Sequence, residues 1–144
     1  MNALVVAVCI GLLAACASEP VEVTPADYLA DLQSICVDTT AAFDALPSPP
    51  EQISVADFAT SAAGALDNEA ERARTLDVPG DLSDDHRAFV RNTDEQVVAW
   101  RAIATVGDDS ARLDELTVRI GELIRGRNDL VDEMGAPACR RGDV

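Results

Sequence analysis

The chain has 144 residues and a formal net charge of −15 at pH 7, from 26 acidic and 11 basic residues. All of the basic residues are arginines. Nucleic-acid binding needs a basic face, and electrostatic adhesion to anionic lipid needs clustered cations, so this charge argues against both.

The first segment, residues 1–15, contains an apolar run of about 13 residues that ends in Leu13-Ala14-Ala15, directly before Cys16. A membrane-spanning helix needs about 20 apolar residues, whereas the core of a signal peptide takes about 7–15. The pattern resembles the lipobox of a bacterial lipoprotein signal peptide. The resemblance implies cleavage after residue 15, a fatty acid such as palmitate on Cys16, and a domain anchored at the extracytoplasmic face of the cell membrane. Because Met1-Asn2 carries no Arg or Lys, an ordinary secretory signal, and thus a secreted domain, is the alternative.

Four cysteines are present, and two of them remain in the domain after processing and lipidation. Cys9 leaves with the signal and Cys16 takes the lipid, so Cys36 and Cys139 are expected to form one disulfide in an oxidising compartment. The alternative is two free buried thiols. The closed loop of about 100 residues gives a chain-entropy stabilisation of at most roughly 4.7 kcal/mol.

Residues 16–24 form the lipidated cysteine and its tether, and residues 25–135 contain four amphipathic segments. The first segment begins at Thr24, which can cap a helix, and ends before Pro47. Spacings of three and four place six residues, Cys36 among them, on one inward face: Tyr28, Leu32, Ile35, Cys36, Thr39 and Phe43. The second begins at Ser54 and ends by residues 78–80, with Glu69–Arg72 and Glu71–Arg74 expected as ion pairs on its outer side.

The third segment is expected to begin at Ser83 and to end at Gly107. The fourth begins at Asp108 or Asp109, with Ser110 as a further candidate cap, and ends at Gly135. Four such segments with short links predict an all-α fold, an antiparallel four-helix bundle that follows the signal peptide. The tail, residues 136–144, must fold back along the first helix for Cys139 to reach Cys36, which predicts a tail pinned across the bundle end.

No metal or cofactor site is expected. His86 is the single histidine, and Asp81, Asp84 and Asp85, like Asp108 and Asp109, lack the spacing of a calcium loop. The stretch from Gly121 to Arg127 mimics a phosphate loop, but no strand precedes it and Arg127 stands in place of lysine. Arg125, Arg127 and Asp129 are interpreted as a solvated charged cluster, and Arg141-Gly142-Asp143 as a chance adhesion tripeptide in a flexible tail. No nucleophile lies in a glycine-flanked elbow, so no enzyme is expected.

Tyr28 and Trp100 lie on helical stripes and are interpreted as core residues rather than as pocket walls. The arginine-only, alanine-rich composition is typical of high-GC genomes, and the chain resembles the small helical envelope lipoproteins of actinobacteria. With its anchor and its lack of catalytic groups, it is expected to be an interaction module that binds another envelope protein. The alternative is a carrier of a small apolar or cationic ligand in the bundle.

Overall fold

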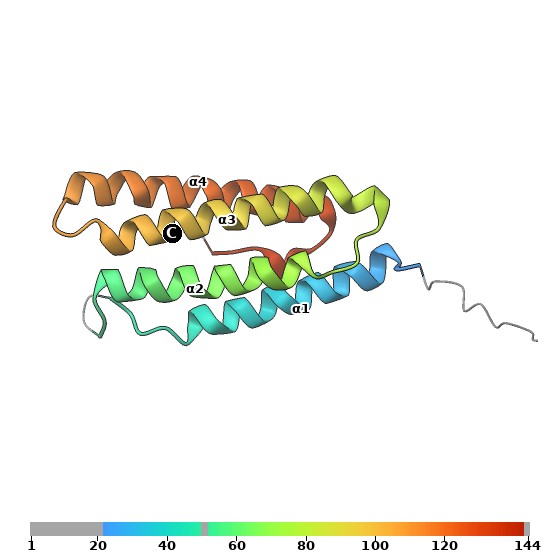
Figure 1. Ribbon diagram of the computed structural model, residues 1–144, viewed down its shortest axis with the longest axis horizontal. Helices are drawn as coiled ribbons and strands as arrows, with labels where there is room; N and C mark the ends of the chain where they lie inside the picture. The colour runs from blue at the N-terminus through green and yellow to red at the C-terminus, as the bar shows by residue number, and fades with distance from the viewer. Residues whose placement is uncertain (1–21, 50–51, 143–144) are drawn as a thin grey trace, which may run out of the picture.

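The computed structural model describes residues 22–49 and 52–142, and these fold into a four-helix bundle (Figure 1). The elements are α1 (Pro25–Asp44), α2 (Val55–Arg74), the 3₁₀ turn η1 (Gly80–Leu82), α3 (Ser83–Thr105), α4 (Ser110–Met134) and the 3₁₀ turn η2 (Pro137–Cys139). Successive helices run in opposite directions, and each packs on the next. The predicted all-α bundle is therefore confirmed. Within the described ranges, none of the helices has the length and apolar character needed to cross a bilayer.

Side chains and a glycine set most of the helix ends, as the sequence predicts. Thr24, Ser54 and Asp109 each accept a hydrogen bond from the backbone N–H three residues later, at the starts of α1, α2 and α4. Such caps satisfy donors that the first turn of a helix leaves free. Gly135 ends α4 in the left-handed conformation, with φ 77° and ψ 31°.

Two serines predicted as caps do not act as caps. Ser83 is the first residue of α3, and the preceding Leu82 provides no side-chain hydrogen bond. The chain enters α3 directly from the turn η1, so a 3₁₀ turn replaces the cap. Ser110 is already inside α4, because Asp109 takes the capping position.

The core runs the length of the bundle and changes character along it. Near the start of α1 and the end of α4, Tyr28, Leu32, Phe89 and Val131 pack around the two cysteines. At the opposite end the core is made by α3 and α4 with Ala59 of α2. Small side chains on the inner face of α2 are buried along the length of the bundle and let α3 approach closely: Ala59, Ala62, Ala63, Ala70 and Ala73.

The fourth side of the bundle, between α1 and α4, is closed by the tail. After Gly135 the chain turns back, and η2 packs against both α1 and α4 (Figure 1). The tail folds back along α1 as predicted, but it runs inside the seam between the two helices rather than across the bundle end. We call residues 136–142 in this position the seam tail. The tail thus completes the core instead of covering it.

Candidate functional site

A buried disulfide fixes the seam tail. Cys36 of α1 and Cys139 of η2 are bonded, with an S–S distance of 2.04 Å and a Cα–Cα distance of 4.9 Å. Both residues are buried. The bond confirms the predicted pairing, and the alternative of two free thiols is wrong. Asn128 of α4 holds the next stretch, since its side chain donates to the carbonyl of Arg141 at 2.9 Å and accepts from its N–H at 2.8 Å.

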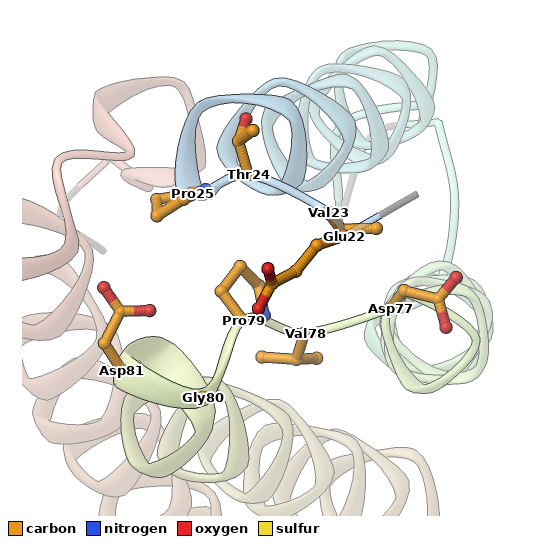
Figure 2. A pocket seen from close by; sticks show the side chains of 9 residues that line it. All are labelled: Glu22, Val23, Thr24, Pro25, Asp77, Val78, Pro79, Gly80 and Asp81. Atoms are coloured by element: carbon orange, nitrogen blue, oxygen red, sulfur yellow. The ribbon is translucent and has the colours of Figure 1, made fainter. Parts of the chain in front are cut away.

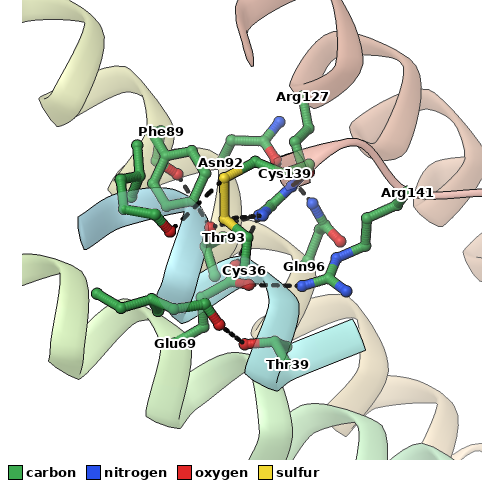
Figure 3. Close-up of polar contacts among 12 residues, drawn as sticks. Cys36, Thr39, Glu69, Phe89, Asn92, Thr93, Gln96, Arg127, Cys139 and Arg141 are labelled. Atoms are coloured by element: carbon green, nitrogen blue, oxygen red, sulfur yellow. Dashed lines mark hydrogen bonds and ion pairs between the residues drawn. A yellow bond between two sulfur atoms is a disulfide. The ribbon is translucent and has the colours of Figure 1, made fainter. Parts of the chain in front are cut away.

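A fully buried ion pair lies beside the disulfide (Figure 3). Arg127 of α4 and Glu69 of α2 are 2.7 Å apart, and both side chains are 0% exposed. Arg127 also donates through Nε to the carbonyl of Cys139 at 2.9 Å and through Nη1 to the Thr93 hydroxyl at 3.1 Å. Its guanidinium lies 4.5 Å from the centre of the Phe89 ring. One side chain therefore connects α2, α3, α4 and the tail.

Glu69 is shared by two arginines. Its second oxygen accepts from Nη2 of Arg141 at 2.6 Å, and the Arg141 side chain is only 10% exposed. Burial lowers the pKa of Arg141, an effect that Glu69 opposes and Arg127 reinforces. We call Arg127, Glu69 and Arg141 the buried triad. It carries two positive charges and one negative charge, a net charge of +1.

The structure overturns two expectations about ion pairs on α2. Glu69 was expected to pair with Arg72 at the surface, but Arg72 instead contacts Asp38 of α1 at 2.8 Å. Arg74, expected to pair with Glu71, contacts Asp94 of α3 at 2.5 Å. The predicted partners are neighbours along one helix, whereas the observed ones come from adjacent helices, because each arginine side chain reaches across a helix interface.

Two further expectations placed arginines in solvent and were wrong. Arg127, assigned to a solvated cluster with Arg125 and Asp129, is buried, whereas those two neighbours are exposed. Arg141, assigned to a flexible tail, is held by Glu69 and Asn128. Asp143 of the same tripeptide lies outside the described residues, as does Cys16.

A pocket of about 210 Å³ lies beside the end of the described tail, and we call it the seam pocket. Phe58 of α2 and Trp100 of α3 meet edge to face in it, with ring centres 5.7 Å apart. Trp100 is half-buried: it packs against the core as predicted, and it also forms part of the pocket wall. All four helices and the tail contribute to the lining: Thr40, Phe43, Asp44, Phe58, Gln96, Trp100, Ile124, Arg140, Arg141 and Gly142.

A second hollow, of about 510 Å³, follows the outer side of the α3–α4 pair, and we call it the outer groove. Its apolar members are Val98, Ala99, Ala102 and Leu116, and Val98 is 66% exposed. Charged side chains line the rest of it: Arg91, Asp94, Glu95, Arg112 and Arg119. An apolar floor with a charged rim is the usual anatomy of a protein interface.

A third hollow, of about 650 Å³, lies where the described chain begins (Figure 2). It is lined by residues 22–25 and 77–81, with Glu22, Asp77 and Asp81 as its charged members. The Asp77 carboxylate points away from the other two (Figure 2). In the part of the chain that the structure describes, no group of three or more His, Cys, Asp or Glu residues is placed to hold a metal ion.

His86 has a structural partner. Its Nδ1 lies 3.0 Å from the hydroxyl of Tyr28, which is a core residue as predicted. Burial, and then the charge of Arg87, lower the pKa of His86, so the neutral ring is favoured. Burial, and then Asp85, raise the pKa of Tyr28 to about 12. The neutral imidazole can therefore accept the tyrosine proton in a hydrogen bond.

The stretch that mimics a phosphate loop, Gly121 to Arg127, is helical throughout and lies inside α4. Its backbone N–H groups are committed to the helix and cannot cradle a phosphate. Comparison with known proteins found no matching family model, no matching curated protein and no matching solved structure.

Sequence reasoning missed the buried triad although part of its signal was present. Arg127 continues the apolar register of Ile120 and Ile124, and Glu69 continues that of Ala62 and Leu66, with spacings of three and four. A charged residue in register with a buried stripe signals a buried ion pair. No comparable periodic signal exists for Arg141.

Proposed function

We propose that this chain is a lipid-anchored interaction module of the cell envelope, held at the extracytoplasmic face of the membrane through Cys16. The buried Cys36–Cys139 disulfide carries this proposal, since disulfides persist in oxidising compartments and are rare in the cytosol. It supports export, which a signal ending at Cys16 would direct.

Charge supports lipid as the means of attachment. The end of the bundle nearest the tether carries Glu22, Asp77 and Asp81 around the entering chain. Anionic lipid would repel this end rather than attract it. The acyl chains on Cys16 would then supply the membrane affinity, and more than one chain is needed for stable anchoring.

The anchoring is tested by labelling cells with radioactive palmitate. We expect label in the natural chain and none in Cys16→Ala. The matched control is Cys9→Ala, which removes the other cysteine of the N-terminal region and should keep the label. A natural chain that takes up no label would contradict the proposal.

The outer groove is the surface we assign to the partner. Arg91, Arg112 and Arg119 face two carboxylates there, and one of these, Asp94, already pairs with Arg74 of α2. The Arg91 side chain has neither a hydrogen bond nor an ion pair to the described residues. Arg112 pairs with Glu115, and Arg119 pairs with Glu95 and Glu122. The groove therefore offers an apolar floor with one side-chain cation, Arg91, open to a partner. We expect it to bind an amphipathic helix whose apolar stripe is flanked by acidic residues.

Two valines on neighbouring helices provide a matched test. Val98 lines the groove and is 66% exposed, whereas Val118 of α4 is 62% exposed and does not line it. In intact cells, crosslinking should join the natural chain to an acid-flanked helix of an envelope protein. Val98→Glu should abolish the adduct and Val118→Glu should retain it. Equal loss or equal retention in the two variants would refute docking in the groove.

A carrier of a small ligand is the second candidate function, and one observation favours it. The seam pocket is bounded by three aromatic rings, from Phe43, Phe58 and Trp100, which come from three different helices. Small-molecule sites are mostly apolar, with a few convergent polar groups. This candidate does not require the outer groove, so the two functions can be tested separately.

A further inference from the structure

We infer that the seam pocket binds a small carboxylate with a one-ring or branched apolar body. This inference rests on the carrier role given above as the second function, and it names the chemical class of the ligand. The inferred ligand is an anion, whereas composition alone suggests a cation, because a chain of net charge −15 attracts cations in solution.

The walls define the apolar part of the ligand. Phe58 and Trp100 present an edge-to-face pair, and Ile124 of α4 adds an aliphatic side chain to the lining. The volume of about 210 Å³ is below the roughly 300–1,000 Å³ of sites for drug-sized molecules. A single ring or a branched chain fits this space, whereas a lipid tail or a nucleotide does not.

The buried triad defines the charge of the ligand. Arg127 and Arg141 share the single carboxylate of Glu69, which leaves one positive charge uncompensated in a poorly solvated region. Arg141 brings that charge to the pocket wall, with its guanidinium carbon 5.0 Å from the centre of the Phe43 ring. A carboxylate beside Arg141 would neutralise the triad.

Arg141 also has an unused donor. Its Nε–H is buried and has no hydrogen-bond partner among the described residues. Buried donors are nearly always paired, and an unpaired one calls for a specific explanation. In the inferred complex the ligand carboxylate is that partner, because arginine forms its strongest hydrogen bonds with carboxylates.

One pocket residue opposes an anion. Asp44, exposed at the end of α1, contributes a negative charge to the lining. More distant carboxylates act weakly, because exposed charges are screened beyond about 8 Å at physiological ionic strength. Asp44 therefore discriminates between ligand classes, since its charge weakens the binding of a carboxylate and strengthens the binding of a cation.

The experiment titrates the full-length folded protein with three probes of one shape: phenylacetate, phenylacetamide and phenethylammonium. Trp100 is the only tryptophan and lies in the pocket wall, so its fluorescence reports occupancy, and calorimetry confirms it. We expect saturable binding of phenylacetate that is tighter than that of either other probe.

Variants of the protein test whether the pocket recognises the charge of the ligand or only its shape. Asp44→Asn should tighten phenylacetate binding about threefold, the effect of one unit charge at about 6 Å in water-like dielectric. Asp31→Asn, an exposed carboxylate on α1 outside the lining, should leave it unchanged. Arg141→Gln should weaken it about tenfold or more, with helicity checked by circular dichroism.

Each outcome is decisive. Tighter binding of phenethylammonium or phenylacetamide, or weaker phenylacetate binding in Asp44→Asn, would overturn the carboxylate inference while leaving a carrier role intact. No saturable binding of any probe to folded protein would overturn both.

Discussion

Replacing Arg127 by methionine should strongly destabilise the bundle, because the substitution breaks a fully buried ion pair. The change removes the 2.7 Å contact to Glu69 and the hydrogen bonds to Cys139 and Thr93. Removing one partner of a buried pair costs about 3–5 kcal/mol, while domains of this size are stable by only about 5–15 kcal/mol. Glu69→Gln should cost at least as much, since it leaves two buried cations facing each other.

The assay is urea unfolding followed by Trp100 fluorescence and circular dichroism. With a slope of about 2 kcal/mol/M, Arg127→Met should lower the midpoint by roughly 2 M. The matched control is Arg119→Met, whose partner Glu95 is 2.8 Å away and where both side chains are about half exposed. Such surface pairs contribute at most about 1 kcal/mol. Similar midpoints for the two variants would refute the argument that Arg127 organises the core.

Two further predictions concern the disulfide and the histidine. Replacing Cys36 and Cys139 together by alanine should lower the free energy of unfolding by about 2–5 kcal/mol, measured in urea, because the bond closes a separation of 103 residues; an unchanged midpoint would be inconsistent with this. The pKa of His86 is lower in the folded state than its ordinary value of 6.5, so the unfolded chain takes up the proton first as pH falls. The stability that His86 contributes is therefore lost as pH falls from above about 6.5 toward the folded-state pKa. His86→Gln keeps an acceptor for Tyr28 and should lack this loss. Arg74 and Arg87 line the same surface depression, but they are present in both proteins and so do not account for the difference. Parallel pH profiles of urea midpoints for the two proteins would contradict the assignment.

The helices could be predicted from sequence because their signals are local. Apolar residues recur at spacings of three and four, and Pro47 and Gly135 mark two of the stops. The start of α3 was predicted less accurately, because it depends on the turn before the helix as well as on residue type. Ser83 was interpreted as a cap because residue type alone cannot show that η1 leads directly into α3.

The position of the tail could be predicted only in part. Two cysteines in an exported domain predict a bridge, and the bridge requires the tail to fold back along α1. The path inside the seam could not be predicted, because it depends on α1 and α4 being held apart. The seam pocket follows from that path, so no sequence signal indicated it.

The buried triad shows why residue type can mislead. Arginine and glutamate are almost never fully buried unless they are paired, so Arg127 and Glu69 were placed in solvent. They are 58 residues apart in sequence, and Arg141 lies 72 residues from Glu69. Their pairing could be found only once the fold had brought α2, α4 and the tail together.

The measurement that tests the central claim most directly is the intact mass of the protein extracted from the membranes of cells that produce it. We predict a chain that begins at Cys16, carries the added mass of diacylglycerol and acyl groups, and is lighter by two hydrogens for the Cys36–Cys139 bond. A chain that retains residues 1–15, or that begins at an unmodified Cys16, would contradict the lipid-anchored assignment.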